Sequence, residues 1–159
     1  MAIDRVKTYF QQWDMQDRIL EFEESSATVE LAAQAVGCEP ARIAKTLSFR
    51  VDGSPVLIVT AGDARIDNHK YKAAFHAKAK MLSPDEVTAL VGHGVGGVCP
   101  FAVFDGVTVY LDESLKRFET VFPACGSHNS AIKLSIPELE QTSGFSAWVD
   151  VCKLPEATA

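Results

Sequence analysis

The stretch ARIAKTLSFRVDGSPVLIV, residues 41–59, decides the fold of this chain. Residues 47–51 alternate apolar with polar side chains, as a half-buried strand does. The turn DGSP at residues 52–55 separates them from the apolar run at residues 56–59. Two short strands joined by a turn that contains Asp-Gly are typical of a β-hairpin, so we predict a hairpin here.

Helices and strands are interleaved on both sides of this hairpin. The segments between the strands are uneven in length, which favours an α+β domain with a mixed, barrel-like β-sheet flanked by helices over a doubly wound parallel sheet. Just before the hairpin, Pro40 begins a short helix that runs to about Ala44. Capping residues and apolar spacing predict helices at residues 3–13, 29–36, 67–75, 83–91 and from 135, and strands at 19–22, 102–104, 107–111, 120–122, 132–134 and 148–152.

Composition describes one acidic globular domain over residues 1–159, with residues 1–24 as an N-terminal helical extension. Hydrophobic residues make up 47% of the chain, and 21 Asp and Glu against 15 Lys and Arg give a net charge of −6. This balance argues against nonspecific coating of nucleic acid, although a local patch can still hold one nucleic-acid end. No window approaches the roughly 18 apolar residues of a membrane span, and the charged start MAIDRVKTYF lacks a signal-peptide core. We therefore expect a cytoplasmic protein without membrane contact.

The aromatic residues of the N-terminal extension have two interpretations. Phe10 and Trp13 lie with Val6 on one face of the predicted helix, together with the neighbouring Tyr9. Helical spacing explains this face as a contribution to the core, which we favour. The alternative is a surface that docks a partner protein.

The cysteines and histidines show no spacing that a metal site requires. The sequence contains no CxxC, HExxH or HxH pattern, so we predict no metal ion. A disulfide framework is not expected without a secretory signal, and the thiols are predicted to be free. The four cysteines are Cys38, Cys99, Cys125 and Cys152.

Four features can carry chemistry, and each also has an ordinary structural interpretation. Lys45 is either a solvated cap of the short helix or an ammonium directed into a pocket. The glycine-rich loop 92–100 is either a flexible connector or a source of backbone N–H donors for a ligand. The polar loop 126–130 is either a turn or part of a site. The basic run 69–80 is either a solvated helix face or a patch for a polyanion.

A series of motifs connects these features in one order along the chain. The motifs are ARIAKTL at 41–47, VLIV at 56–59, GDARID at 62–67 leading to Lys70, GVCPFA at 97–102, VYLDES at 109–114 and ACGSH at 124–128. Over roughly residues 25–153 this order resembles the YbaK/prolyl-tRNA editing-domain family of aminoacyl-tRNA deacylases. The resemblance implies the barrel-like mixed sheet already expected from the pattern of elements.

The resemblance also implies an activity that serves translation fidelity. The enzyme would act in trans on a mischarged tRNA and hydrolyse the ester of a small amino acid such as Ala, Cys, Ser or Thr. Its partner would be the aminoacylated tRNA 3′ end, with an aminoacyl-tRNA synthetase as a second candidate, and no cofactor is implied. The alternative is a non-catalytic module of the same fold that binds tRNA 3′ ends or a synthetase.

Carried over by position, Lys45 is the expected catalytic residue. The family pattern has Gly where this chain has Ala102, which adds a methyl group to the loop. A catalytic thiol at Cys99 would need an activating base, and none is evident nearby in the sequence. The residues expected to bind the substrate are Thr46, Gly97, Val98, Cys99, Pro100, Gly126, Ser127 and His128. The expected contacts to the tRNA are Lys70, Lys72, Lys78 and Lys80.

Overall fold

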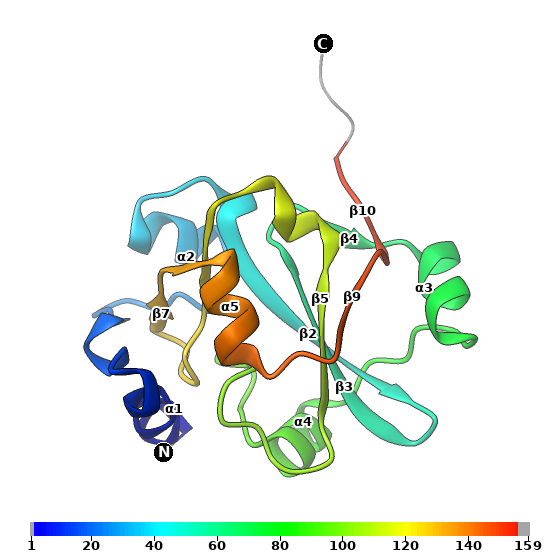
Figure 1. Cartoon of the computed structure of the whole chain (residues 1–159), viewed down its shortest axis with the longest axis horizontal. Coiled ribbons are helices and arrows are strands. Elements are labelled where there is room, and N and C mark those ends of the chain that lie inside the picture. The colour runs from blue at the N-terminus through cyan, green and yellow to red at the C-terminus, as the bar shows by residue number, and fades with distance from the viewer. Residues whose placement is uncertain (1, 156–159) are drawn as a thin grey trace.

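The computed structural model describes residues 2–155, and a six-stranded sheet forms the centre of the molecule. In spatial order its strands are β8 (Leu134–Ser135), β6 (Thr120–Pro123), β2 (Ile43–Val51), β3 (Ser54–Ala61), β5 (Thr108–Asp112) and β9 (Ala147–Val149). β2 pairs with β3 and β6 with β8 in antiparallel register, whereas the other neighbours are parallel. The sheet curls into half a barrel (Figure 1), which confirms the predicted α+β class with its mixed, barrel-like sheet.

Helices and two small antiparallel strand pairs surround this sheet. β1 (Ile19–Glu21) pairs with β7 (Ser130–Ile132), and β4 (Arg65–Ile66) pairs with β10 (Cys152–Lys153). The helices are α1 (Ala2–Phe10), α2 (Val29–Val36), α3 (Asn68–Phe75), α4 (Pro84–Val91) and α5 (Ile136–Ser143), and the 3₁₀ turns are η1 (Gln11–Trp13), η2 (Gln16–Arg18), η3 (Pro40–Arg42) and η4 (Glu113–Arg117). In Figure 1, α2 and α3 lie at opposite ends of the view. No helix within residues 2–155 is long and apolar enough to cross a membrane.

The central hairpin is longer than the alternation predicted. β2 pairs with β3 from Ala44 to Val51. The turn Asp52-Gly53 has φ values of 51° and 79°, the left-handed conformation that tight hairpin turns require. β2 begins at Ile43 because β6 pairs with its first two residues. The short helix predicted before the hairpin is therefore a 3₁₀ turn that ends at Arg42.

Three strand predictions were wrong in whole or in part. The segment predicted as one strand at 132–134 is divided between two, because β7 ends at Ile132 and β8 begins at Leu134. Residues 102–104 form no strand, because the first of them has a φ of +54° and its carbonyl accepts a hydrogen bond from Arg5 Nε at 3.1 Å. The strand predicted at residues 148–152 is interrupted, so β9 and β10 are separate. Between them, the backbone N–H of Val151 donates to the buried carboxylate of Asp112 at 2.9 Å, which turns the chain away from β5.

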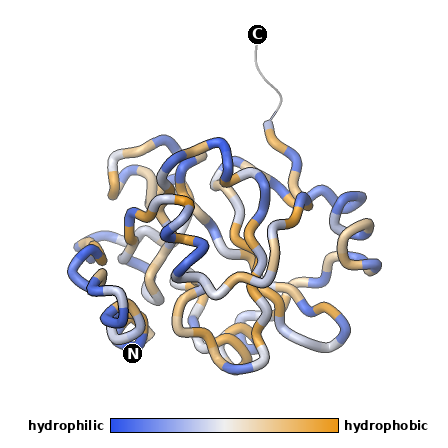
Figure 2. The backbone as a smooth tube through the Cα atoms, in the orientation of Figure 1, coloured by the Kyte–Doolittle hydropathy of each residue, from blue (hydrophilic) through white to orange (hydrophobic). Residues whose placement is uncertain are grey.

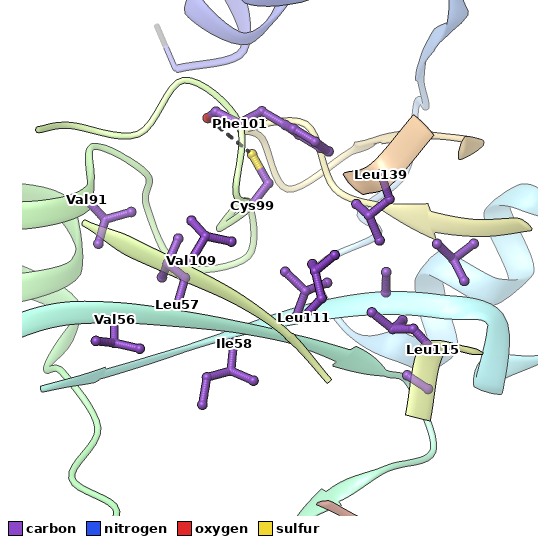
Figure 3. Packing of buried hydrophobic residues seen from close by; sticks show 14 of the residues in the cluster. Val56, Leu57, Ile58, Val91, Cys99, Phe101, Val109, Leu111, Leu115 and Leu139 are labelled. Carbon is purple, nitrogen blue, oxygen red and sulfur yellow. Dashed lines mark hydrogen bonds between the residues drawn. The ribbon is translucent and has the colours of Figure 1, made fainter. Parts of the chain in front are cut away.

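One hydrophobic core joins the N-terminal helix to the sheet. Leu57 of β3 and Leu111 of β5 are fully buried at its centre (Figure 3). Val6 and Phe10 of α1 are buried in the same cluster, and the ring of Phe10 lies 4.7 Å from that of Phe101. Hydrophobic residues gather along the central strands, and the outer turns are more hydrophilic (Figure 2). α1 therefore completes the core, the interpretation that its spacing favoured.

Candidate active site around Lys45

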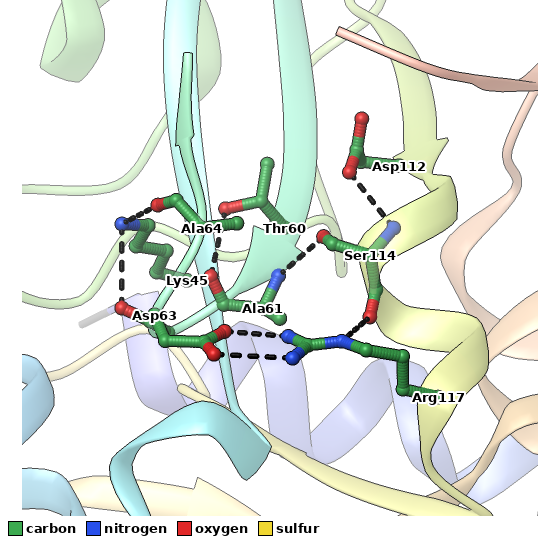
Figure 4. Close-up of polar contacts among 9 residues, drawn as sticks. Lys45, Thr60, Ala61, Asp63, Ala64, Asp112, Ser114 and Arg117 are labelled. Carbon is green, nitrogen blue, oxygen red and sulfur yellow. Dashed lines mark hydrogen bonds and ion pairs between the residues drawn. The ribbon is translucent and has the colours of Figure 1, made fainter. Parts of the chain in front are cut away.

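Lys45 lies within β2, not at the end of a helix. Its Nζ donates hydrogen bonds to the backbone carbonyl oxygens of Ala64 at 2.5 Å and Gly62 at 3.4 Å (Figure 4). An ammonium has three N–H donors, so one remains for a ligand. Burial lowers the pKa of Lys45 from its ordinary value of 10.5, and the nearby charge of Arg65 adds to this lowering. The side chain is thus a half-buried, oriented donor and no longer a candidate helix cap.

The turn that accepts from Lys45 is held rigidly from two sides. A Cβ atom on Gly62 would lie 2.1 Å from the carbonyl oxygen of Pro40, so only glycine permits this approach to η3. On the other side, both carboxylate oxygens of Asp63 bind the guanidinium of Arg117. Arg117 Nε in turn donates to the carbonyl of Ser114 in η4 at 3.0 Å (Figure 4). Because the acceptors cannot move, the ammonium has a fixed direction.

A mostly apolar hollow of about 270 Å³, which we call the apolar pocket, lies between α2, β2, α4 and the glycine-rich loop. Lys45 is the only titratable side chain among its lining residues in the described part of the chain. Within residues 2–155, no group of three or more His, Cys, Asp or Glu side chains is arranged to hold a metal ion. The apolar walls include Val29, Ala32, Val87, Val95, Val98 and Phe122.

A gap in the edge of β2 opens into this pocket. β6 pairs with β2 only at residues 43–44, and the segment 80–82 pairs with β2 at Ser48 and Arg50. Because antiparallel pairing alternates along a strand, the backbone N–H and C=O of Thr46 face the gap between these two neighbours. Thr46 Oγ1 is also buried, and no hydrogen-bond partner for it lies within residues 2–155. The pocket therefore has a small set of polar groups beside Lys45.

The two loops that the sequence singled out pack against each other behind the pocket. A Cβ atom on Gly97 would lie 2.6 Å from the backbone nitrogen of Ser127 and 2.7 Å from the carbonyl carbon of Gly126. A Cβ atom on Gly96 would lie 3.2 Å from that of Ala27, next to α2. The glycines permit close contact between backbones, so the loop 92–100 forms an ordered wall of the pocket.

His93 links the two ends of the glycine-rich loop and was missed by the sequence analysis. Its Nε2 lies 2.8 Å from the carbonyl oxygen of Phe101 and 3.5 Å from Cys99 Sγ. A carbonyl only accepts, so Nε2 carries the proton and cannot take one from the thiol. Burial lowers the pKa of His93 and raises that of Cys99 to about 12. An imidazole thus lies beside Cys99, but the pair stays neutral and holds the loop together.

The structure brings only part of the expected substrate-binding set to the apolar pocket. Lys45, Thr46 and Val98 line it. Cys99 is fully buried, and Pro100 lines a separate groove beside α1. The remaining members, Gly97, Gly126, Ser127 and His128, lie outside its lining.

The loop residues Ser127 and His128 are engaged in local contacts. Ser127 Oγ lies 2.9 Å from Asn129 Oδ1 and 2.8 Å from Ser130 Oγ. The carbonyl of His128 accepts from the backbone N–H of Ser26 at 2.6 Å, which ties this loop to the segment before α2. The His128 side chain is exposed. These contacts give both residues a part in shaping the pocket wall.

The lysines expected to contact tRNA do not gather at the apolar pocket. Lys70 and Lys72 lie on α3, which is far from α2 in Figure 1. Lys70 Nζ is already bound by Asp150 and by the carbonyl of Cys152, each at 3.0 Å. α3 ends at Phe75, so Lys78 and Lys80 lie on the coil that follows it.

The comparison with known families agrees with this geometry. The family model described as an aminoacyl-tRNA editing domain matches residues 23–142, a range that contains Lys45, the apolar pocket and the glycine-rich loop. The chain belongs to this family, which confirms the predicted family membership.

Three individual proteins are similar to most of the chain. It is 56% identical to the protein YwhH of Bacillus subtilis, over 96% of this chain and 98% of that protein. It is 30% identical to "Putative Cys-tRNA(Pro)/Cys-tRNA(Cys) deacylase EbsC" of Enterococcus faecalis, over 76% of each chain. Among solved structures it matches "Crystal structure of a putative trans-editing enzyme for prolyl tRNA synthetase" with a TM-score of 0.85 and 27% identity, over 96% of this chain and 97% of that one. The family thus includes a relative named as a deacylase.

Proposed function

We propose that this chain is a deacylase that acts in trans in the cytoplasm and hydrolyses the ester of tRNA mischarged with a small amino acid such as Ala, Cys, Ser or Thr. One observation carries the proposal. Lys45 presents a single free N–H donor at the wall of a small apolar pocket that has no other titratable side chain among its lining residues within the described chain. The family membership supports the same reaction class.

The chemistry requires little from the protein, because an aminoacyl ester is already activated. A water oxygen attacks the ester carbonyl carbon, the bond from that carbon to the ribose oxygen breaks, and the ribose oxygen takes a proton. Charge develops on the carbonyl oxygen in the transition state, where a fixed cationic donor stabilises it. Lys45 supplies that donor, and the backbone N–H of Thr46 at the edge of β2 is a second one.

Activation of the water falls to the substrate itself. The lining residues of the apolar pocket within residues 2–155 include no carboxylate, imidazole or thiol. An ammonium that donates to two carbonyl oxygens is not a base. The ribose hydroxyl next to the ester can hold the attacking water, together with the Thr46 hydroxyl, whose Oγ1 has no hydrogen-bond partner within residues 2–155.

Substrate selection follows from the size and character of the pocket. A volume of about 270 Å³ is below the range of roughly 300–1,000 Å³ that drug-sized ligands occupy. Its walls are mostly apolar side chains, and contact with them limits the size of the amino acid that fits. Attractive recognition of one methylene is worth only about 1–3 kcal/mol, which explains why a separate editing protein is useful.

A panel of mischarged tRNAs tests this proposal. Wild-type protein is incubated with purified tRNAs that carry Ala, Cys, Ser, Thr or, as the bulky comparison, Phe, and the released amino acid is measured. We expect hydrolysis of at least one small aminoacyl-tRNA and not of the Phe ester. Binding without turnover would support the non-catalytic module instead. Absence of both binding and turnover would contradict both the deacylase and the non-catalytic binding module.

A further inference from the structure

A second hollow, which we call the polar cleft, shares Lys45 with the apolar pocket. It has a volume of about 680 Å³ and is lined from one side by the turn after β3 and from the other by β10. Its charged lining residues are Glu30, Lys45, Asp63, Arg65 and Lys153. Lys45 therefore lies where an apolar hollow meets a charged one.

Two cations of the cleft directly oppose each other across a strand pair. In the β4–β10 ladder, Arg65 is the register partner of Lys153. Like charges in this position destabilise a sheet. Both side chains are exposed, and within residues 2–155 neither has an ion pair or hydrogen bond. The neighbouring cations differ, because Lys70 binds Asp150 and Arg117 binds Asp63.

The charges of the cleft sum to an excess of positive charge. Asp63 is neutralised by the bidentate contact from Arg117, outside the lining. The remaining lining charges are Lys45, Arg65 and Lys153 against Glu30. This local excess lies in a chain whose net charge is −6. Asp67 lies outside the lining, and its pKa is lowered mainly by a hydrogen bond from the backbone N–H of Lys70 and further by the charge of Lys153, but no ion pair joins Asp67 to Lys153. A cation pair that has no direct ion-pair partner within residues 2–155 is suited to an anionic ligand.

The position of Lys45 indicates which anion the polar cleft would bind. The proposed reaction places the small amino acid in the apolar pocket and its ester beside the Lys45 ammonium. The terminal ribose carries that ester and is joined to its own phosphate, so the first phosphate lies within one nucleotide of Lys45. The polar cleft is the charged hollow that begins at the same ammonium.

We propose that the polar cleft binds the backbone phosphate of the 3′-terminal nucleotide of tRNA, with Arg65 and Lys153 as its contacts. This inference rests on the proposed function and names the binding subsite for the nucleotide part of the substrate. Arg65 offers a planar fork that matches phosphate oxygens, and Lys153 adds a point charge. The cross-strand repulsion between them is relieved when the phosphate binds.

The test replaces both cations and keeps a variant of equal charge as its control. The double variant Arg65→Gln, Lys153→Gln is compared with the double variant Lys116→Gln, Lys133→Gln, which removes two exposed positive charges from η4 and from the residue between β7 and β8. The first variant should bind uncharged, full-length tRNA about tenfold more weakly, because a charged hydrogen bond is lost. Its plot of log K against log salt concentration should be shallower by about 0.7 for one phosphate of a single strand. The control variant should bind as the wild type does.

Three further measurements decide between outcomes. On a tRNA without its 3′-terminal nucleotides, the cleft variant and the wild type should bind equally, and a persisting difference would overturn the proposal. Without RNA, the cleft variant should be at least as stable as the wild type, which excludes misfolding as the cause. If the wild type hydrolyses its substrate and the cleft variant binds tRNA as tightly as the wild type does, this inference alone is overturned. A wild type that binds tRNA without hydrolysing it would overturn only the proposed reaction, and one that does neither would overturn both.

Discussion

The apolar pocket and the polar cleft share Lys45 and Val29 but are lined by opposite kinds of residue. The pocket is small, and its walls come from α2, α4 and the glycine-rich loop, with Lys45 as the single titratable residue that lines it within residues 2–155. The cleft is larger and is lined by charged residues of the turn after β3 and of β10. The difference matches a substrate with a small amino acid at one end and a phosphate at the other. A residue at their boundary can act on the ester that joins these two parts.

Among the changes that compare the apolar pocket with the polar cleft, Gly62→Ala is expected to lower the deacylation rate most. The added Cβ would lie 2.1 Å from the carbonyl oxygen of Pro40, so the turn must shift and move the acceptors of Lys45. A displacement of about 1 Å at a catalytic group can lower the rate by about 100-fold. We expect a loss of that order in deacylation of the preferred small aminoacyl-tRNA.

Gly94→Ala is the matched control for this change. Gly94 belongs to the glycine-rich loop, and in the described part of the chain no neighbouring atom lies within 4 Å of a Cβ built on it. Its rate should stay close to that of the wild type. Equal losses in both variants would show that the turn does not direct Lys45.

A smaller effect should come from Val98→Ala, which changes the apolar pocket and not the polar cleft. Val98 lines the apolar pocket, and its shortening makes room for a larger amino acid. We expect the rate on the next larger aminoacyl-tRNA, relative to the preferred one, to rise about tenfold. Val103→Ala is the control, since Val103 is also partly buried against the main core but is not among the residues that line the pocket. A similar change of selectivity in both variants would contradict the assignment of this hollow to the amino acid.

The stability of the protein should depend on pH through His93, which holds the glycine-rich loop of the pocket wall together. Burial lowers the pKa of His93 in the folded protein below its ordinary value of 6.5, so the unfolded chain takes up the proton first as the pH falls. The free energy of unfolding should therefore decrease from pH 7 to pH 5, by at most about 1.4 kcal/mol per pH unit for one proton. Glu86 and Glu138, with pKa values of about 2, lose their contribution only below about pH 4.5.

Urea unfolding of His93→Gln measures this contribution. The glutamine amide can still donate to the carbonyl of Phe101, but it does not titrate. The variant should have a flatter dependence on pH between 7 and 5 than the wild type. His69→Asn on the exposed face of α3 should keep the wild-type slope, and a flattened slope there would assign the effect to another cause.

The smallest expected effect is a gain in stability from Ala102→Gly. Ala102 has a φ of +54°, a conformation that costs a residue with a side chain roughly 1–2 kcal/mol and glycine almost nothing. Because glycine also loses more entropy on folding, we expect a net gain of about 0.5–1 kcal/mol. The opposite sign is expected for Ala73→Gly within α3. A destabilised Ala102→Gly variant would show that the methyl group makes favourable contacts in the loop.

The hairpin and the glycine-rich loop were predictable because their signals lie within a few adjacent residues. The same local pattern located Lys45 but not its hydrogen-bond acceptors, because every residue has a carbonyl and only the fold selects those of Gly62 and Ala64. Ala102 was misassigned to a strand because its apolar neighbours outweighed a turn that depends on Arg5.

The polar cleft could not be predicted from the sequence. β4 and β10 each contain two residues, which is too short for any periodicity, so the pairing of Arg65 with Lys153 leaves no local signal. The basic run 69–80 drew attention because its lysines are adjacent in sequence. Arg65 and Lys153, which line the polar cleft with Lys45, come from distant parts of the chain. The pairing of β4 with β10 brings them together.

The most direct test of the account is the single-turnover rate of Lys45→Met on the small aminoacyl-tRNA that the wild type hydrolyses best. Methionine keeps the unbranched side chain as far as Cε and removes the ammonium, and thermal unfolding verifies that the variant is folded. With enzyme in excess, we expect the rate to fall by at least about 100-fold, as for loss of a donor to a developing oxyanion. A folded Lys45→Met variant that hydrolyses at the wild-type rate would contradict the central role of this side chain.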